Sequence, residues 1–348
     1  MSSRRGTGHK EQMHRTDELL DAAREGDPDA YRALVEPHRA ELHAHCYRML
    51  GSVHDAEDAL QEALLRAWRG LPRFEGRSST RAWLYKIATN ASLRLLERRP
   101  KRVLPADRLP SAGGDVDSGE PLVESTWVEP YPDDQIADGR AAPDARYEQR
   151  EGVELAFIAA LQHLPVLQRA ALILREVLGF SAQETAETLE TTVPSVNSAL
   201  QRARKTVDER LPDRSQQATL RAIGDERIRD LVEGYMDALE RADLDAVLAM
   251  LTEDAAWSMP PLSTWYRGQE AVSGFLRNGP LNVRWRHLPA HANGQVAVGC
   301  YMWDEQAGVY KAYVLDMLTL RGDRIAEVTA FIGPDVLQRF GLPSELRD

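Results

Sequence analysis

Residues 55–102 read DAEDALQEALLRAWRGLPRFEGRSSTRAWLYKIATNASLRLLERRPKR, and this stretch decides the fold. Apolar residues in its first half recur at three- and four-residue spacing, which predicts an amphipathic helix with one buried stripe. The stripe consists of Ala56, Ala59, Leu60, Ala63, Leu64, Ala67 and Trp68. Acids gather at the front of the helix, where its dipole favours negative charge, and Ser52 or Asp55 is expected to cap it. We expect Asp55 and Asp58 to be exposed.

The second half of the stretch is strongly basic. Residues 66–102 contain eleven Arg and Lys against two acids, a net of +9 (11 − 2) in a chain whose total charge is −11. Aromatic residues are interleaved with these cations: Trp68, Phe74, Trp83 and Tyr85. Basic side chains among exposed rings suit melted nucleic acid, because phosphates meet the charge and unstacked bases meet the rings. Taken singly, each Arg also fits a solvated helix face, and each Trp fits a hydrophobic core.

The order of these features resembles the second domain of bacterial sigma factors of the extracytoplasmic-function group. The matching features are the acidic helix start, the Arg-Ala-Trp at residues 66–68, Phe74, and the Ser-Ser-Thr-Arg-Ala-Trp-Leu at residues 78–84. The resemblance implies that the acidic helix binds the clamp of RNA polymerase through Asp55, Glu57, Asp58, Gln61, Glu62, Arg66 and Trp68. It also implies that the basic half melts and reads promoter DNA through Phe74, Arg77, Ser78, Arg81, Trp83, Lys86, Asn90, Arg94 and Arg98.

Length and composition limit the remaining possibilities. A chain of 348 residues fits two or three domains, the first of them at residues 16–102. Cys46 and Cys300 are too few and too far apart for a disulfide framework, and we expect buried thiols. Residues 1–15 are charged and lack an apolar run, which predicts a disordered tail and not a signal peptide. With no apolar stretch of membrane-spanning length, we expect a soluble, cytoplasmic protein without membrane contact.

An acidic linker is predicted at residues 103–150. It is rich in Pro and Gly and has lost hydrophobic periodicity, and residues 103–154 hold thirteen acids against four Arg. Solvated disorder is one interpretation. The resemblance implies another, in which the linker occupies a basic channel of the polymerase. The segment Trp-Val-Glu-Pro-Tyr-Pro at residues 127–132 carries two aromatics in an extended, Pro-fixed backbone, and we expect it to dock, with one of this chain's own domains as a candidate.

A helix-turn-helix is predicted within residues 151–212. Ser181 and Glu184 form a capping-box pattern, and Pro194 stands in the first turn of the second helix, where its missing N–H is harmless. After the block at residues 55–102, this segment resembles the fourth sigma domain, which reads the upstream promoter element. The resemblance implies DNA contacts from Ser195, Asn197, Ser198, Gln201, Arg202, Arg204 and Lys205. The pattern departs from the family at Glu190, which replaces the usual turn glycine, and at Asn197 and Ala199, where basic residues are common.

The rest of the chain, residues 216–348, predicts an α+β domain. Helices are expected at residues 225–241, 244–251 and 269–276, followed by strands at 283–288, 295–303, 309–320 and 324–331, with a turn at Asn293-Gly294. Three helices before a curved antiparallel sheet resemble the SnoaL-like cone, the fold of polyketide cyclases and ketosteroid isomerases. Such cones enclose a pocket, for which the candidate residues are Trp257, Trp285, His287, Tyr301, Trp303, Tyr313 and Asp316. A plain core, a ligand pocket without chemistry and a His287–Asp316 catalytic pair all remain open.

The sequence therefore predicts a multidomain protein with two all-α domains that bind DNA and polymerase, followed by an α+β cone. The expected function is promoter recognition, DNA melting and transcription initiation as a sigma factor, with the cone modulating activity. The expected partners are core RNA polymerase (the β′ clamp and β flap), promoter DNA, and a small ligand or regulatory protein at the cone. No enzyme activity, cofactor or metal is expected. The alternatives are a DNA-targeted enzyme with cyclase- or isomerase-like chemistry, a free-standing repressor, and a factor whose cone is a passive surface for an anti-sigma protein.

Overall fold

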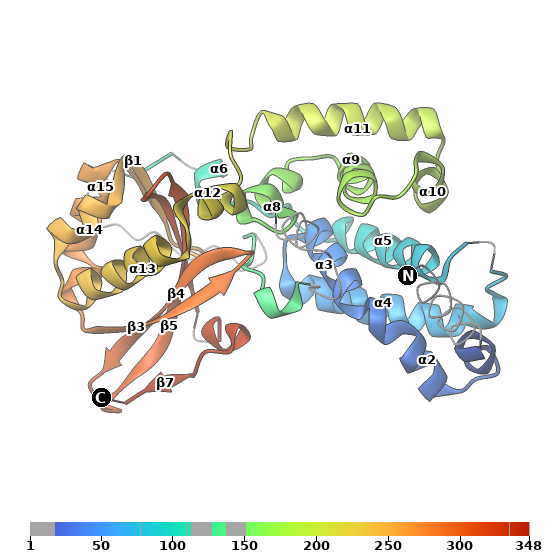
Figure 1. The fold of residues 1–348 in the computed structure, drawn as a ribbon, viewed down its shortest axis with the longest axis horizontal. Helices are drawn as coiled ribbons and strands as arrows, with labels where there is room; N and C mark the ends of the chain where they lie inside the picture. The colour runs from blue at the N-terminus through green and yellow to red at the C-terminus, as the bar shows by residue number, and fades with distance from the viewer. Residues whose placement is uncertain are drawn as a thin grey trace, which may run out of the picture. The chain divides into compact units, whose positions relative to one another are not determined.

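A computed structural model describes residues 18–76, 78–108, 110–112, 127–136, 151–333 and 335–347. The chain divides into two compact units, which are described separately (Figure 1). The helical unit combines residues up to Leu50 with His54–Arg98 and Val166–Leu200, and the sheet unit holds Gly51–Val53, Arg99–Pro165 and Gln201–Asp348. The expected disordered tail and much of the acidic linker lie outside the described residues. The predicted fold class, helical domains followed by an α+β sheet domain, is confirmed.

The helical unit is built on three helices, α3 (Arg39–Leu50), α4 (Val53–Gly70) and α5 (Thr80–Leu96). Helix α2 (Pro28–Val35) precedes them, and Asp27 caps it by accepting the N–H of Asp29 and of Ala30. Cys46 and Tyr47 of α3 and Tyr85 and Ala88 of α5 are fully buried. The expectation of buried thiols is also confirmed, since Cys46 and Cys300 are both free and buried.

The helix-turn-helix begins in the same unit. Helix α9 (Val166–Leu172) runs into a π-helical turn (Ile173–Val177) and is followed by α10 (Ala182–Thr188) and α11 (Val193–Asp208). Arg169 is buried and donates to the carbonyl of Met49, and burial lowers the pKa of its guanidinium to about 10. Helix α8 (Leu155–Gln162), four residues before α9, belongs instead to the sheet unit.

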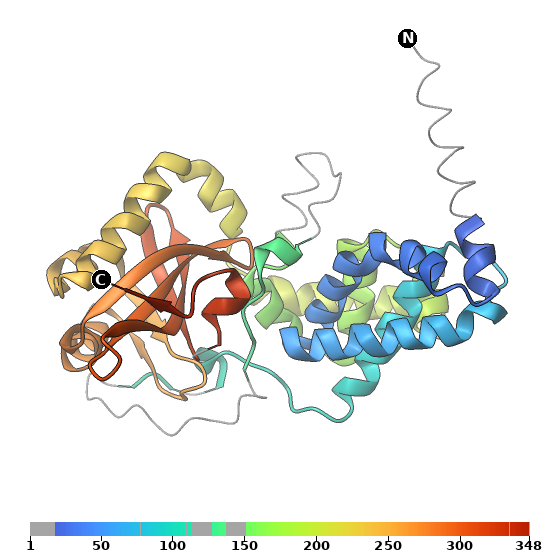
Figure 2. The same ribbon diagram turned by 90° about the horizontal axis from the view of Figure 1, so that it is seen from below.

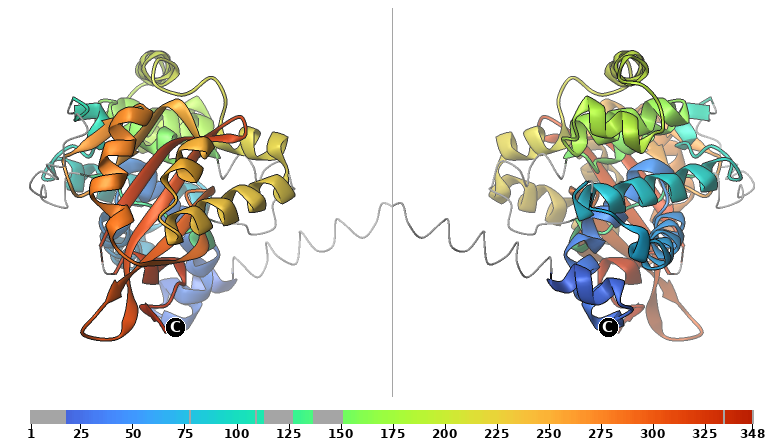
Figure 3. Two further views of the ribbon diagram at one scale, coloured as in Figure 1. Left: turned by 90° about the vertical axis from the view of Figure 1, so that its left-hand side faces the viewer. Right: turned by 90° about the vertical axis from the view of Figure 1, so that its right-hand side faces the viewer.

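The sheet unit is an α+β domain in which helices lie beside a curved sheet (Figures 2 and 3). The strand order is β2-β1-β6-β5-β4-β3. Strands β3 (Trp285–Ala292), β4 (Gln295–Asp304), β5 (Val309–Arg321) and β6 (Arg324–Ile332) match the four predicted strands, with β3 lying further along the chain than expected. The helices are α12 (Gln216–Ile223), α13 (Asp225–Glu240), α14 (Leu244–Met250) and α15 (Gln269–Asn278). The short strand β7 (Glu345–Leu346) pairs with β5.

The expectation of three helices followed by an antiparallel sheet is wrong in one respect. Strands β1 (Leu251–Ser258) and β2 (Trp265–Arg267) precede α15, and β1 pairs with β6 in parallel. In β1, Glu253 and Asp254 are adjacent and both exposed, and the β1–β6 register shifts between Leu251 and Ala256. This irregularity removes the alternation by which a half-buried strand is recognised in a sequence.

The segment at residues 127–136, here called the linker strap, packs against the sheet unit. The Trp127 indole N–H donates to the carbonyl of Pro261 at 3.0 Å, and Tyr131 is fully buried. The Tyr131 N–H donates to the side-chain oxygen of Asn293 at 2.7 Å, and the Asn293 N–H donates to the Tyr131 carbonyl at 2.8 Å. The expectation that this segment docks on one of the chain's own domains is therefore confirmed.

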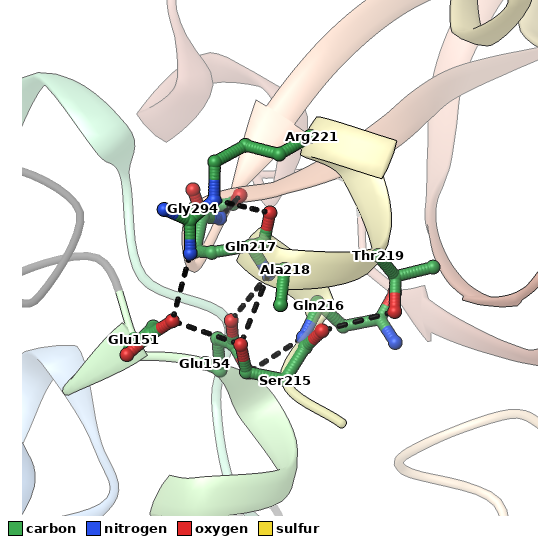
Figure 4. A network of polar contacts seen from close by, with 9 residues as sticks. All are labelled: Glu151, Glu154, Ser215, Gln216, Gln217, Ala218, Thr219, Arg221 and Gly294. Atoms are coloured by element: carbon green, nitrogen blue, oxygen red, sulfur yellow. Dashed lines mark hydrogen bonds and ion pairs between the residues drawn. The ribbon is translucent and has the colours of Figure 1, made fainter. Parts of the chain in front are cut away.

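A polar cluster joins the start of α8 and the start of α12 at the β3–β4 turn (Figure 4). The strap bonds to the same turn through Tyr131 and Asp133. Glu154 accepts the N–H of Gln216 at 3.0 Å and of Gln217 at 2.8 Å, and burial raises the pKa of its carboxyl to about 7. The Gln216 side chain pairs with the Leu320 backbone as a strand would, donating to its carbonyl and accepting its N–H. Asn293 donates to the Val153 carbonyl at 2.6 Å.

Asn293 occupies a position that suits few residues. Its φ is 54° and that of Gly294 is 70°, the two positive values of the predicted Asn-Gly hairpin turn. Replacing Asn293 with Gly keeps the backbone conformation but deletes both side-chain hydrogen bonds, whereas Ala also adds backbone strain. We expect Asn293→Gly to lower the free energy of unfolding by about 2 kcal/mol and Asn293→Ala by about 3 kcal/mol.

Chemical denaturation of the full chain, followed by far-UV circular dichroism, measures both changes. Asn282→Ala is the matched control, because Asn282 is exposed and donates one local hydrogen bond to the Arg277 carbonyl. A wild-type unfolding curve for Asn293→Gly would mean that the two side-chain bonds contribute nothing to stability.

Candidate polymerase and nucleic-acid interface

Helix α4 has one buried and one polar face. Ala56, Ala59, Leu60, Ala63 and Ala67 are buried, as the stripe predicts. Four of the polymerase-binding candidates are exposed on the other face, namely Asp58, Gln61, Glu62 and Arg66. Glu62 and Arg66 form an ion pair one turn apart, and the half-buried Glu57 lies 3.3 Å from Arg39. Trp68 is half-buried and packs edge-on against Tyr31, with ring centroids 5.0 Å apart.

The expectation that Asp55 is exposed is wrong, because its side chain belongs to the buried face. Asp55 is 3% exposed. It lies one residue before Ala56 and four before Ala59, both fully buried, which places it at the edge of the apolar stripe. Asp58, three residues further on, is exposed as expected. Asp55 therefore has a structural position in α4, and the exposed acids begin at Asp58.

The start of α4 is held by a residue that the sequence analysis missed. Helix α4 begins at Val53, whose N–H donates to the carboxylate of Glu129 at 2.9 Å. The Ser52 hydroxyl donates to the same carboxylate at 2.9 Å, and the guanidinium of Arg102 lies 3.2 Å from it. The sequence predicts Ser52 or Asp55 as the cap of this helix, and Ser52 shares the Glu129 carboxylate with Val53. Glu129 is the acid of the Trp-Val-Glu-Pro-Tyr-Pro segment. Its pairing with Val53 could not be predicted from the sequence because the two residues are 76 positions apart.

The basic half of the stretch forms α5 and the turn before it. Phe74 is buried and stacks on the half-buried Trp83, with ring centroids 4.7 Å apart. Arg81 donates to Glu41 at 3.0 Å and lies over the rings of Tyr85 and Phe180. Ser78, Arg94 and Arg98 are exposed, Lys86 and Asn90 are half-buried, and Arg77 lies outside the described residues. One ring face of Trp83 is thus occupied by Phe74.

Acids of the helix-turn-helix face the basic helix α5. A groove of about 640 Å³ is lined by Trp83 and Lys86 from α5 and by Glu184 and Glu187 from α10. The Lys86 ammonium lies 3.5 Å from the carboxylate of Glu190, in the turn after α10. Within this unit Lys86 and Arg81 are therefore paired with acids, whereas Arg94 and Arg98 are exposed.

The helix-turn-helix geometry follows its predicted signals. The Ser181 side chain accepts the Glu184 N–H, and the Glu184 carboxylate accepts the Ser181 N–H, so the predicted capping box is confirmed. Glu190 has a φ of 52°, a conformation that favours glycine and explains why its place in the turn is unusual. In α11 the residues Val196, Leu200, Ala203 and Val207 are buried. All seven predicted DNA-binding residues are exposed: Ser195, Asn197, Ser198, Gln201, Arg202, Arg204 and Lys205.

The sheet unit contains a cavity of about 270 Å³. Five of the predicted pocket residues line it, namely Trp257, Trp285, His287, Tyr313 and Asp316. Tyr301 and Trp303 do not, and their assignment to the pocket is wrong. Tyr301 donates its hydroxyl to the Pro343 carbonyl, and Trp303 packs edge-on against Tyr310. The irregular β4–β5 register at Cys300 and Tyr301 breaks the alternation on which their predicted facing relied.

Two ionisable groups of the cavity are strongly perturbed. Asp316 accepts the Tyr235 hydroxyl at 2.8 Å, and burial raises the pKa of its carboxyl to about 6. The Nδ1 atom of His287 lies 3.3 Å from the carboxylate of Glu240. Burial lowers the pKa of the His287 imidazole to about 4. The imidazole is therefore neutral near pH 7. Among the residues that the structure describes, no group of three His, Cys, Asp or Glu is placed to hold a metal ion.

Three parts of the chain match known families. Residues 34–102 match the family Sigma-70 region 2, residues 154–207 match Sigma-70, region 4, and residues 232–328 match the SnoaL-like domain. The first match contains α4 and α5, the second covers α8–α11, and the third contains most of the residues that line the cavity. Across the described part of the chain, every helix is too short or too polar to cross a membrane.

Similar proteins support the same assignment along most of the chain. The sigma factor SigG of Mycobacterium tuberculosis is 42% identical over 333 residues, which are 93% of this chain and 86% of that protein. The sigma factor SigW of Bacillus subtilis is 30% identical over 195 residues, 55% of this chain and 93% of that protein. The crystal structure of Mycobacterium tuberculosis SigJ shares the fold, with a TM-score of 0.54, 24% identity and coverage of 88% of this chain and 97% of that one. The chain therefore belongs to the extracytoplasmic-function sigma factors, which are transcription initiation factors and not enzymes, and it carries a SnoaL-like domain after the sigma regions.

Proposed function

We propose that this sigma factor binds core RNA polymerase through the polar face of α4, opens DNA with α5 and contacts the upstream promoter element with α11. The observation that carries the proposal is the two-faced burial of α4 and α11, each with an apolar side packed inside and its candidate contact residues exposed. Exposed polar side chains on a rigid helix can meet a partner without disturbing the fold. Since this partner is the transcription machinery, we place the action of the chain in the cytoplasm.

The polymerase contact is proposed to rest on Asp58, Gln61, Glu62 and Arg66. These residues share the exposed face of α4, and Asp58 lies closest to the helix start among them. Asp58 carries a negative charge on this exposed face, while Glu62 pairs with Arg66, and such a face suits a basic patch on the partner. Asp55 is excluded from this contact by its burial.

Asp58→Lys tests the polymerase contact. We expect the dissociation constant for core polymerase to rise about tenfold, about 1.4 kcal/mol, because an attractive charge becomes repulsive. Fluorescence anisotropy with labelled protein measures this change. The control is Asp230→Lys, the same charge reversal at an exposed position of α13. Equal weakening by both variants would point to net charge, and no weakening by Asp58→Lys would remove α4 from the interface.

We propose that different residues of α11 contact the phosphates and the base edges of the upstream promoter element. Arg202, Arg204 and Lys205 are long cations suited to phosphates, whereas Asn197 and Gln201 carry amides that can hydrogen-bond base edges. Phosphate contacts carry no sequence information, so loss of a cation and loss of an amide have different signatures.

Arg202→Ala and Asn197→Ala separate these two roles. We expect Arg202→Ala to weaken binding on every promoter and to reduce the slope of log affinity against log salt concentration by about 1. Asn197→Ala should instead alter the preferred bases in a selection from random DNA. An unchanged salt slope for Arg202→Ala, or an unchanged selected sequence for Asn197→Ala, would contradict the corresponding role.

DNA melting is proposed to require a different arrangement of α5 and α10. Trp83 and Lys86 share their groove with Glu184 and Glu187, and phosphates are repelled by carboxylates so close. Arg81 is engaged by Glu41 and Phe180. We infer that polymerase and promoter binding draw α10 away from α5, which frees Lys86 and the outer face of Trp83.

The cone is proposed to modulate initiation through the linker strap. The strap inserts Trp127 and Tyr131 into the sheet unit, while Glu129, between them, holds the first residue of α4. Release of the strap would therefore remove the helix start from its carboxylate partner. The described part of the linker is also unavailable to a polymerase channel while it is docked.

Removal of the cone and release of the strap should act in the same direction. We expect a protein truncated after Leu211 to bind core polymerase but to differ from wild type in its rate of transcription from one promoter. Trp127→Ala combined with Tyr131→Ala should shift that rate with the same sign. Trp303→Ala serves as the control, because Trp303 packs on Tyr310 away from the strap. Unchanged initiation after truncation would contradict a modulatory cone.

A further inference from the structure

The cavity of the sheet unit is mainly apolar and partly open to solvent. Of the residues that surround it, Val283 is 42% exposed and Tyr313 is 38% exposed. Trp285 lies beside Tyr313 with ring centroids 6.1 Å apart. Exposed apolar side chains beside an apolar cavity are costly unless a ligand covers them. The volume of about 270 Å³ is close to the lower end of the range for small-molecule sites.

The polar groups of the cavity give it a negative character. Asp316 is the one Asp or Glu among its described lining residues, and neither Lys nor Arg occurs among them. The other ionisable side chains facing Asp316 are Tyr235 from α13 and Cys300 from β4, both uncharged near pH 7 because burial raises their pKa values. His287 from β3 is neutral there as well, and the acid beside it is Glu240 at the end of α13.

Asp316 retains capacity for another donor. Its carboxylate accepts the Tyr235 hydroxyl at 2.8 Å, whereas the Cys300 thiol donates to the Val298 carbonyl. A carboxylate has about four acceptor positions, so positions remain for a further donor. Burial without a cationic partner raises the pKa of Asp316 to about 6, which means that an added positive charge would be stabilised at this site.

The walls also suit a cation. The ring centroids of Trp257 and Phe275 are 5.9 Å apart, and Trp285 and Tyr313 also line the cavity. Aromatic faces attract ammonium groups through the ring quadrupole, most strongly where water is excluded. An anionic ligand would meet Asp316 without any compensating cation in the wall.

We propose that this cavity binds a lipophilic amine, with its apolar body among the aromatic side chains and its ammonium group on the Asp316 carboxylate. The assignment is independent of the proposed modulation of transcription, because it concerns binding alone. A neutral ligand of the same shape is the competing occupant.

Three probes with one hydrocarbon body test the assignment on the full-length chain: 2-naphthylmethylamine, 2-naphthylmethanol and 2-naphthoic acid. Isothermal titration calorimetry at pH 7.5 should show the amine binding at least tenfold more tightly than the alcohol, with the acid weakest. In Asp316→Asn the affinity for the amine should fall to the affinity for the alcohol. Asp304→Asn should leave the order unchanged, because Asp304 pairs with Lys311 on the surface of the sheet.

Two further measurements keep the test decisive if Asp316→Asn folds poorly. In the wild type, amine affinity should fall about tenfold between pH 7.5 and pH 5, as Asp316 takes up a proton, while alcohol affinity stays constant. Val314→Phe, which places a larger side chain at the cavity wall, should weaken the amine and the alcohol alike.

Several results would overturn the proposal. Equal affinity for amine and alcohol at both pH values would make the cavity a site for neutral molecules. Preferred binding of the naphthoate would contradict the charge argument. Undiminished amine binding by Val314→Phe would place the ligand elsewhere, and no binding of any probe at millimolar concentration would leave the cavity as part of the core.

Discussion

The sheet unit depends on the hydrogen bonds of one buried turn. Asn293 joins the strap to the start of α8 by bonding the backbone of Tyr131 and of Val153, and Gly294 donates to Asp133 in the strap. Backbone groups of three distant segments are satisfied at this point, and burying them unpaired would cost about 1–3 kcal/mol each. The adjoining Glu154 and Gln216 extend the cluster to α12 and β5. The cone is thus held partly by residues that lie 140 and 162 positions before this turn.

The net charge of the chain does not reveal how unevenly its charged residues are distributed. Asp58 of α4 and Arg202 of α11 are exposed, whereas Arg81 and Lys86 in α5 are paired with Glu41 and Glu190. An exposed charge is available to a partner at little cost, but a paired one must first be released. Asp58 and Arg202 are therefore accessible in this state, whereas Arg81 and Lys86 are engaged by their acidic partners.

Structural features that depend on a few neighbouring residues could be predicted from the sequence. The Ser181–Glu184 capping box and the Asn293–Gly294 turn depend on neighbours in the chain, and both were predicted correctly. Asp55 was wrongly predicted to be exposed, because a charged residue is expected on the surface, whereas Asp55 lies at the edge of the buried stripe of α4. Strand β1 was missed because its partner β6 lies about seventy residues later and its own alternation is broken at Glu253 and Asp254. Glu129 as the partner of Val53, and Tyr235 as the partner of Asp316, required the three-dimensional structure.

The distance along the chain between Tyr131 and Asn293 also has a consequence during synthesis. The two residues are 162 positions apart. At a ribosomal rate of about 5–20 residues per second, roughly 8–30 s pass between their appearance. During that interval both sigma regions have been translated while the strap still lacks its binding site. The nascent chain therefore presents both sigma regions before the hairpin at Asn293, and the strands β5 and β6 that follow it, have been made.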